Sequence, residues 1–228
     1  MARPSRQIDQ ALLDSGRRLY PRLGCAGMSV RTLAADAGVN QAMFHYHFGS
    51  KDDFLRALLQ SMYEEMFGAL SAAARQDGSA LLSLRHALGG MARFARTHRR
   101  VLARVWTDAM SGQTVARDFF AANAPRHLGL LLELMRQAQA DGELRELPPL
   151  QRVSYLMGAV LLPVIFIAGL LDATGQAALM PGFERQVISD AAIDARVDLA
   201  LAALHPPRAA RRGTLVQVDG GRKARSGA

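Results

Sequence analysis

The stretch "SVRTLAADAGVNQAMFHYHFGSK", residues 29–51, decides the fold that this sequence predicts. Two short segments with helical periodicity flank Gly38, a residue suited to the left-handed backbone that ends a helix. Ser29 precedes the first segment and Asn40 the second, and both residue types cap helix N-termini. Helices of two or three turns are marginal in water unless other helices pack against them. The pattern therefore predicts a compact helix-turn-helix over residues 29–48.

The segments on either side of this motif also predict helices. Upstream, Ile8, Leu12 and Leu19 recur at helical spacing, and Gly24 stands where that helix would end. Downstream, Ser50 has the side chain of an N-cap for the next helix. The sequence therefore supplies one helix before the motif and one after it, which can cover the two short helices.

The remainder of the chain predicts longer helices and no strand of more than a few residues. Breaks between these helices are expected at 76–79, 97–100, 110–114, 141–150 and 172–183. The prediction is an all-α fold of about nine helices in total. A three-helix domain at 4–64 would contain the helix-turn-helix, and a larger helical domain would follow at 65–205. Residues 206–228 are rich in Gly and Arg and are expected to form a basic, disordered tail.

The net charge of +8 is unevenly distributed. Residues 1–52 carry 7 Lys and Arg against 4 Asp and Glu, residues 53–204 carry 15 against 15, and residues 205–228 carry 6 against 1. A neutral middle with two basic ends suits a protein that contacts a polyanion such as nucleic acid, although basic tails also serve solubility. The single cysteine, Cys25, excludes an internal disulfide and a Cys-based zinc site, and it fits a reducing cytoplasm.

One segment raises a membrane alternative. Residues 153–171 are 19 uncharged positions, which is long enough to cross a bilayer and would make the chain a single-span membrane-anchored sensor with a cytoplasmic helix-turn-helix. Gly158, Pro163 and Gly169 dilute the hydrophobicity of the segment. A helix that is apolar all round also suits a position between the protein's own core and a partner subunit. We favour this second interpretation, and expect a cytoplasmic protein without a signal peptide or a membrane contact.

Residues 41–48 contain a dense cluster of aromatic and histidine side chains, and a helix over this range would place them on different faces. At about 100° per residue, Phe44 and Phe48 form one stripe that is expected to face the core. His45 and His47 point roughly 200° apart and cannot hold one metal ion, and no Cys, Asp or Glu lies beside them to complete a site. The chain also lacks a nucleophile elbow and a phosphate-binding glycine loop. We therefore expect no metal, no cofactor and no catalytic residues, and a protein that is not an enzyme.

The outward residues of this helix suit contacts with double-stranded DNA. Gln41 can pair with adenine through two hydrogen bonds, and Ala42 and Met43 can lie against a thymine methyl group. His45 and Tyr46 can donate to phosphate oxygens. These residue types are therefore those that a recognition helix in a major groove would carry.

Two cations flank the same helix. Lys51 lies in the first turn of the following helix, where a cation makes more sense with a phosphate present because the helix N-terminus already favours an anion. Arg31, near the start of the preceding helix, can reach a guanine edge or the DNA backbone. Each position alone is as readily a solvated surface residue. Their joint placement around one groove-sized helix favours DNA binding.

The longer string "SVRTLAADAGVNQAMFHYHFGSKDDFLRALL" resembles the DNA-binding domain of TetR/AcrR-type transcriptional regulators, and the resemblance runs from about Ile8 to Tyr63. The shared pattern is Thr/Ser-x-Arg-x-Leu/Ile-Ala-x-x-Ala-Gly-Val-Ser, followed by a short helix that ends Tyr-x-His-Phe-x-Ser/Asn-Lys. In this chain Asn40 replaces the usual Ser and keeps its capping role, and His45 stands where Tyr is common. Cys25 takes the place of an aromatic residue.

The resemblance implies a homodimer whose two recognition helices enter successive major grooves of a near-palindromic operator. It implies base-facing roles for Arg31, Gln41, Ala42 and Met43. It implies contacts with the DNA backbone for Ser29, His45, Tyr46, His47 and Lys51. The predicted DNA-binding set is Ser29, Val30, Arg31, Asn40, Gln41, Ala42, Met43, His45, Tyr46, His47 and Lys51.

The resemblance further implies a ligand-responsive regulator, most often a repressor. The larger domain would bind an unknown small-molecule effector that alters the spacing of the two DNA-binding domains. The dimer would form through the last two long helices, at about 150–172 and 184–204. Candidates for the effector pocket are the large side chains Trp106, Phe119, Phe120, Met135 and Tyr155, although such residues in long helices are more often plain core.

Overall fold

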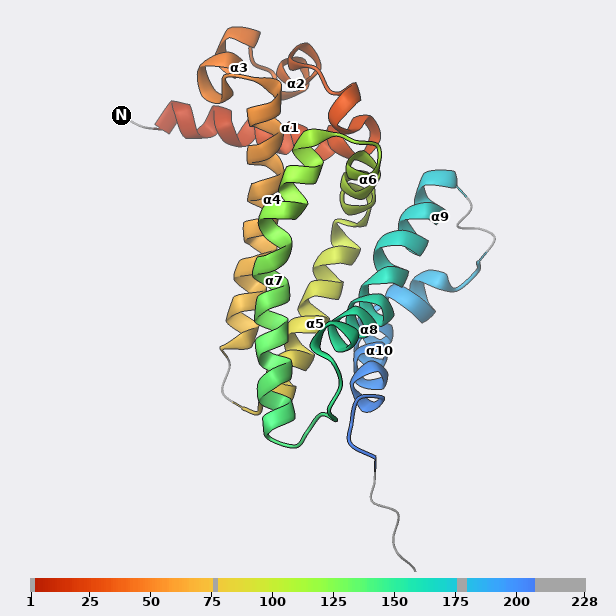
Figure 1. The fold of residues 1–228 in the computed structure, drawn as a ribbon. Helices are drawn as coiled ribbons and strands as arrows, with labels where there is room; N and C mark the ends of the chain where they lie inside the picture. The colour runs from red at the N-terminus through yellow and green to blue at the C-terminus, as the bar shows by residue number, and fades with distance from the viewer. Residues whose placement is uncertain (1–2, 76–77, 176–179, 208–228) are drawn as a thin grey trace, which may run out of the picture.

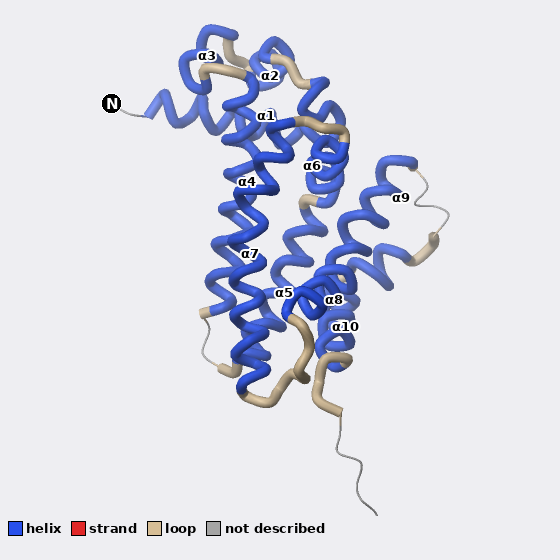
Figure 2. Tube along the Cα trace, in the orientation of Figure 1, coloured by secondary structure: helices blue, strands red, loops and turns tan. Residues whose placement is uncertain are grey.

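The computed structural model describes residues 3–75, 78–175 and 180–207, and every regular element in these ranges is helical (Figures 1 and 2). The predicted all-α fold is confirmed. The helices are α1 (Arg3–Gly27), α2 (Val30–Ala37), α3 (Gln41–Phe48), α4 (Lys51–Ala74), α5 (Ala80–Thr97), α6 (Arg99–Met110), α7 (Thr114–Ala140), α8 (Pro149–Leu162), α9 (Ala168–Thr174) and α10 (Asp190–Ala202), with two π-helical segments, η1 (Pro163–Ile167) and η3 (Glu184–Ile188). The predicted disordered tail lies almost wholly outside the described residues, which end at 207.

The helix-turn-helix forms through the capping residues that the sequence predicts. Ser29 Oγ accepts a hydrogen bond from the amide of Thr32 at 3.1 Å, and Asn40 Oδ1 accepts one from the amide of Met43 at 2.8 Å. Gly38 has φ 70°, the left-handed conformation that glycine adopts without strain. The two short helices are therefore α2 and α3, as expected.

The head of the molecule consists of α1, α2, α3 and the N-terminal half of α4, at the top of Figure 1. Phe44 of α3 is fully buried in its core, as are Leu12 of α1, Leu33 of α2 and Phe54 of α4. The ring centroid of Phe44 lies 5.3 Å from that of Phe54 and 5.9 Å from that of Phe48. One face of α3 is therefore fixed to all three neighbouring helices.

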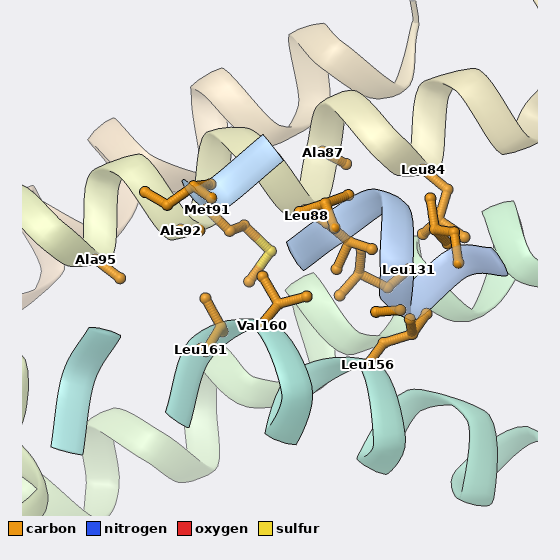
Figure 3. Packing of buried hydrophobic residues seen from close by; sticks show 14 of the residues in the cluster. Leu84, Ala87, Leu88, Met91, Ala92, Ala95, Leu131, Leu156, Val160 and Leu161 are labelled. Carbon is orange, nitrogen blue, oxygen red and sulfur yellow. The ribbon is translucent and has the colours of Figure 1, made fainter. Parts of the chain in front are cut away.

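The body consists of the remainder of α4 and of α5 to α10, and its core is centred on α5 (Figure 3). Leu84 and Leu88 of α5 are fully buried in one cluster with Leu131 of α7 and with Leu156 and Val160 of α8. Figure 3 shows the α5 side chains facing those of α8 across this cluster. The apolar stripe of each helix thus has a partner within the body.

The head and the body share a helix, because α4 runs without a break past the boundary expected between residues 64 and 65. Leu58 of α4 belongs to the head core, whereas Leu70 belongs to the body core. Val101 and Val105 of α6 also pack into the head core. Figure 1 shows α4 and α7 running side by side between the two parts.

The apolar segment from residue 149 to 172 is one continuous helix, in which the π-helical turn η1 separates α8 from α9. The division falls at η1, which begins at Pro163, a residue that has no N–H to donate to the preceding turn. With a mean hydropathy of 2.3, this segment is the one described helix that is long and apolar enough to cross a membrane. Its residues Leu156, Val160 and Val164 are buried in the body core.

A matched pair of glycine substitutions tests the packing of the head. A Cβ at buried Gly16 of α1 would lie 2.8 Å from Phe54 Cζ, whereas a Cβ at exposed Gly68 of α4 would meet nothing within 4 Å. Gly16→Ala is expected to lower the free energy of unfolding by about 1–3 kcal/mol through overpacking. Gly68→Ala is expected to raise it by about 0.5–1 kcal/mol because alanine favours helix. Urea denaturation measures both; a stabilising Gly16→Ala would show that α1 and α4 are not closely packed.

Candidate nucleic-acid interface

The two faces of α3 have different chemistry. Phe44 is fully buried, whereas Tyr46 is 79% exposed. Gln41 and Ala42 are exposed at the start of the helix, and Met43 is half-buried beside them. A short helix is thus held by its phenylalanine face and presents an amide, a methyl group and a phenol on its opposite face.

His45 closes the C-terminus of α3. Its Nδ1 lies 2.7 Å from the carbonyl oxygen of Gly49, which can only accept, so Nδ1 carries the proton and donates. The ring is exposed. In this tautomer Nε2 has no proton, so a neutral His45 can accept but cannot donate to a phosphate oxygen there.

His47 is placed differently from the expectation of an outward contact with the DNA backbone. Its side chain is only 4% exposed, and its Nδ1 lies 2.5 Å from Oδ1 of Asp9 on α1. Its Nε2 is buried and has no hydrogen-bond partner among the described residues. His47 therefore joins α3 to α1, and neither ring nitrogen is presented at the surface.

Lys51 has a partner within the head. Its Nζ donates to the carbonyl oxygen of Cys25 at 3.1 Å, which ties the start of α4 to the end of α1. In the first turn of α4, Ser50 Oγ donates to Oδ2 of Asp53 at 2.6 Å; this hydrogen bond, with a further contribution from Arg56, lowers the pKa of that carboxyl group and stabilises its charged form. The lysine is half-buried, so part of its charge remains at the surface.

Arg31 and Ser29 lie at the start of α2, next to α3. Arg31 is exposed, and no carboxylate lies within ion-pair distance of it in the described part of the chain. By contrast, Arg18 of α1 pairs with Asp36 at 2.7 Å. Ser29, like Asn40, uses its side-chain oxygen as a helix cap, and half-buried Val30 packs against the head core. Among the predicted residues, Arg31 is therefore the exposed cation of the head that is free for an external anion.

The predicted effector residues do not gather around one cavity. Met135 is fully buried in the body core, whereas Tyr155 is 41% exposed on α8. Trp106 lies edge-on to Phe120 with centroids 5.7 Å apart, and Phe119 packs against Phe120 at 5.6 Å. These three side chains of α6 and α7 do form one cluster. One hollow in the described part of the molecule lies elsewhere and is lined by Ala168, Leu171, Asp172, Met180, Pro181, Gly182, Phe183 and Glu184.

Several of these contacts have no signal in the sequence. Phe166 of η1, whose ring centroid lies 5.2 Å from that of Trp106, belongs to the same aromatic cluster. Asp9 and His47 are far apart in the sequence, and neither forms a recognisable motif with the other. Within the residues described, no three His, Cys, Asp or Glu side chains are grouped to hold a metal ion.

The fold and this face together define a helix-turn-helix protein. Residues 12–58 match the family described as "Bacterial regulatory proteins, tetR family". The HTH-type transcriptional regulator BetI of Brucella canis is 32% identical over 65 residues, which are 28% of this chain and 33% of that protein. BetI of Rhizobium meliloti strain 1021 is 34% identical over 79 residues, which are 32% of this chain and 39% of that protein. The chain thus matches these curated relatives over little more than a third of their length.

Solved structures extend the likeness to the whole fold. The TetR-family regulator PfmR of Thermus thermophilus has a TM-score of 0.63 at 19% identity, covering 86% of this chain and 99% of its own. FadR of Bacillus subtilis, solved in complex with stearoyl-CoA, has a TM-score of 0.68 at 14% identity, covering 86% of this chain and 99% of its own. Residues 12–58 thus match the DNA-binding domain of the TetR family, and the fold of the chain is similar to that of these regulators.

Two histidine substitutions test the different positions of the rings on α3. His47→Ala removes a nearly buried side chain and leaves Asp9 without its partner, so the free energy of unfolding should fall by about 1–3 kcal/mol. His45→Ala alters an exposed ring and should change that free energy by no more than about 0.5 kcal/mol. Thermal and urea unfolding measure both variants. Equal effects would contradict the inward placement of His47.

Proposed function

We propose that this protein regulates transcription by binding a near-palindromic operator as a homodimer, and that it is a repressor released by a small-molecule effector. The observation that carries the proposal is the division of α3 into a buried phenylalanine face and an exposed face with Gln41, Ala42 and Tyr46. Helix α3 has no acidic residue that would repel phosphate. A helix of this kind fits the major groove.

Base reading is assigned to the N-terminal end of α3. The exposed amide of Gln41 can form two hydrogen bonds with adenine, and the side chains of Ala42 and Met43 suit a thymine methyl group. Arg31 and Lys51 supply positive charge on the flanks of the helix, where phosphates would lie. Tyr46 is assigned to the DNA backbone, whereas the Nδ1 proton of His45 is already donated to Gly49 and His47 is withdrawn from that role by its position against α1.

The dimer is assigned to α8 and α10. Tyr155 and Leu162 of α8 and Leu199 of α10 are exposed large apolar side chains, at 41%, 49% and 72%. The small residues Gly158 and Ala195 are also exposed on these helices and would allow a close approach of a second copy. A symmetric contact of this face would place two recognition helices on one DNA duplex.

A single-span membrane anchor is the alternative use of the same apolar segment. It would require α8 to leave the body, where Leu156 and Val160 are buried and Arg152 is only 3% exposed. Burial of these residues supports a helix that stays in the body and is covered by a partner on its outer side. We therefore propose a cytoplasmic protein.

The effector is assigned to the body. The aromatic cluster of Trp106, Phe120 and Phe166 joins α6, α7 and η1, and Trp106 is 45% exposed. A flat or apolar small molecule could insert between these rings from the surface. Stearoyl-CoA is bound by FadR, which shares the fold at 14% identity. For this chain we propose only that the effector is a small molecule with an apolar part.

Two substitutions separate base reading from phosphate binding. Two duplexes of equal length are compared: the DNA upstream of the protein's own gene and a random sequence. Gln41→Ala should reduce the difference in binding free energy between them by about 1–3 kcal/mol. Lys51→Ala should weaken binding to both duplexes alike. It should also reduce the slope of log K against the logarithm of salt concentration by about one, the loss of one phosphate contact. Fluorescence anisotropy at several salt concentrations measures both effects. A melting curve of Lys51→Ala shows whether loss of the hydrogen bond from Lys51 to the Cys25 carbonyl oxygen destabilises the fold. Equal losses on both duplexes for both variants would contradict the assignment.

A charge on the outer side of α10 tests the dimer. Leu199→Asp should yield a folded monomer with lower operator affinity, because a carboxylate would be buried without a partner in the proposed interface. Met110→Asp is the matched control for assembly, since Met110 of α6 is as exposed as Leu199, at 72%, and lies outside the two proposed dimer helices. Sedimentation velocity gives the assembly state. A wild-type monomer, or a dimer that depends on detergent, would refute the proposed interface.

A further inference from the structure

The head is joined to the body where α6 meets the break in α1 (Figure 1). Gly24 interrupts α1 with φ 62° and ψ −170°, after which the chain continues to Gly27. The guanidinium group of Arg104 from α6 occupies the space that a Cβ at position 24 would take. Arg104 also donates from Nη2 to the carbonyl oxygen of Leu23 at 3.2 Å. The break in α1 is therefore also the docking point of a body helix.

Asp108 of α6 is the centre of this junction, and it is only 3% exposed. Its Oδ2 accepts from the hydroxyl group of Tyr20 and from the amide of Cys25, both at 2.8 Å. Its Oδ1 accepts from Nε of Arg104 at 3.0 Å. A buried carboxylate thus receives three hydrogen bonds, of which two come from α1.

The same stretch of α1 is held from the opposite direction by α4. Lys51 donates to the carbonyl oxygen of Cys25, whose amide donates to Asp108. Lys51 follows α3 after only Gly49 and Ser50. A continuous chain of contacts therefore runs from α6 through the end of α1 to the start of α4, directly behind the recognition helix.

The other end of α6 is tied to the segment that follows the proposed dimer helix α8. Nε of Arg99 lies 2.7 Å from Oδ2 of Asp172 on α9, and Nε of Arg100 lies 3.2 Å from the same oxygen. Gly169 of α9 lies against Ala103 of α6, because a Cβ there would come within 2.9 Å of that of Ala103. Helix α6 is thus connected to α9 at one end and to the head at the other.

Directional bonds to a buried charge make this connection specific. A buried carboxylate that loses its donors is costly, so α6 cannot slide along α1 without leaving Asp108 unsatisfied. Apolar packing of Val101 and Val105 against the head core is less sensitive to direction and would tolerate such a shift. The orientation of the head on the body is therefore set by the polar contacts more than by the apolar ones.

We propose that Asp108 is a positioning residue that fixes the orientation of the head on the body, and thereby the half-site spacing that the dimer accepts. This inference rests on the proposed function, because spacing has meaning only for a dimer that binds two half-sites. In an isologous dimer, both subunits contain this junction. A small rotation of each head on its body therefore changes the separation of the two recognition helices.

The test compares Asp108→Asn with Glu133→Gln in the full-length protein. Glu133 of α7 is also paired with an arginine of its own helix, Arg136, but it is exposed and lies outside the head and the two proposed dimer helices, so it is the matched control. Affinity is measured for the footprinted operator and for versions with about two base pairs added or removed between the half-sites. Asp108→Asn should narrow the preference for the native spacing by about tenfold, the factor for one hydrogen bond to a charged group. Glu133→Gln should leave that preference unchanged.

Amide hydrogen exchange, measured on the protein without DNA, reports on the stability of the contact between α6 and the end of α1. Asp108→Asn should speed exchange of amides in residues 23–28, and Glu133→Gln should not. If Asp108→Asn does not fold, Tyr20→Phe, which removes a single donor, should narrow the spacing preference in the same direction by a smaller factor.

The other possible results distinguish failure of the positioning role of Asp108 from failure of the proposed operator function. If Asp108 served only the stability of the fold, its variants would weaken binding to every operator by one common factor, and the unchanged ratio would overturn the proposal. A wild-type protein that binds all spacings alike would contradict the dimeric operator function itself. Faster exchange with an unchanged ratio would show that the junction loosens without setting the spacing, which also overturns the proposal.

Discussion

Burial of Phe44 is the interaction on which the DNA-facing surface depends. Helices α2 and α3 have eight residues each, too few to be stable alone, and the fully buried Phe44 fixes α3 against α1, α2 and α4. Phe48 and Phe54 extend the same contact. Because one face of α3 is completely used for packing, the backbone that carries the exposed residues of its other face is fixed before any DNA is present, and binding need not order the helix.

The two cores are built so that the head can be held at a defined angle. Helix α4 contributes Leu58 to the head core and Leu70 to the body core, and α6 reaches from α9 to the break in α1. Apolar packing supplies most of the attraction between the parts, whereas the hydrogen bonds to Asp108 supply direction. A change in the body that moved α6 would therefore reach α3 through the end of α1 and the start of α4.

The local features of the head could be predicted from the sequence because their causes are local. Ser29, Asn40 and Gly38 act within a few residues of themselves, and all three form the caps and the turn expected of them. Periodicity likewise separated Phe44 from Gln41 and Tyr46. The ion pair of His47 could not be predicted, because its partner Asp9 lies on a helix whose orientation is set by tertiary packing. The effector candidates come together only in part for the same reason: Trp106, Phe119 and Phe120 form one cluster, but size and hydrophobicity do not distinguish core Met135 from exposed Tyr155.

The proposed function requires the exposed face of α3 to read specific sequence as part of a dimer. Selection of duplexes from a random pool by the wild-type protein, followed by sequencing, measures both requirements at once. We expect enrichment of a two-fold-symmetric sequence whose half-sites lie about one helical turn, or a multiple of it, apart. Enrichment of a single unpaired half-site would contradict the dimer, and retention of all sequences in proportion to their abundance would contradict base reading by α3.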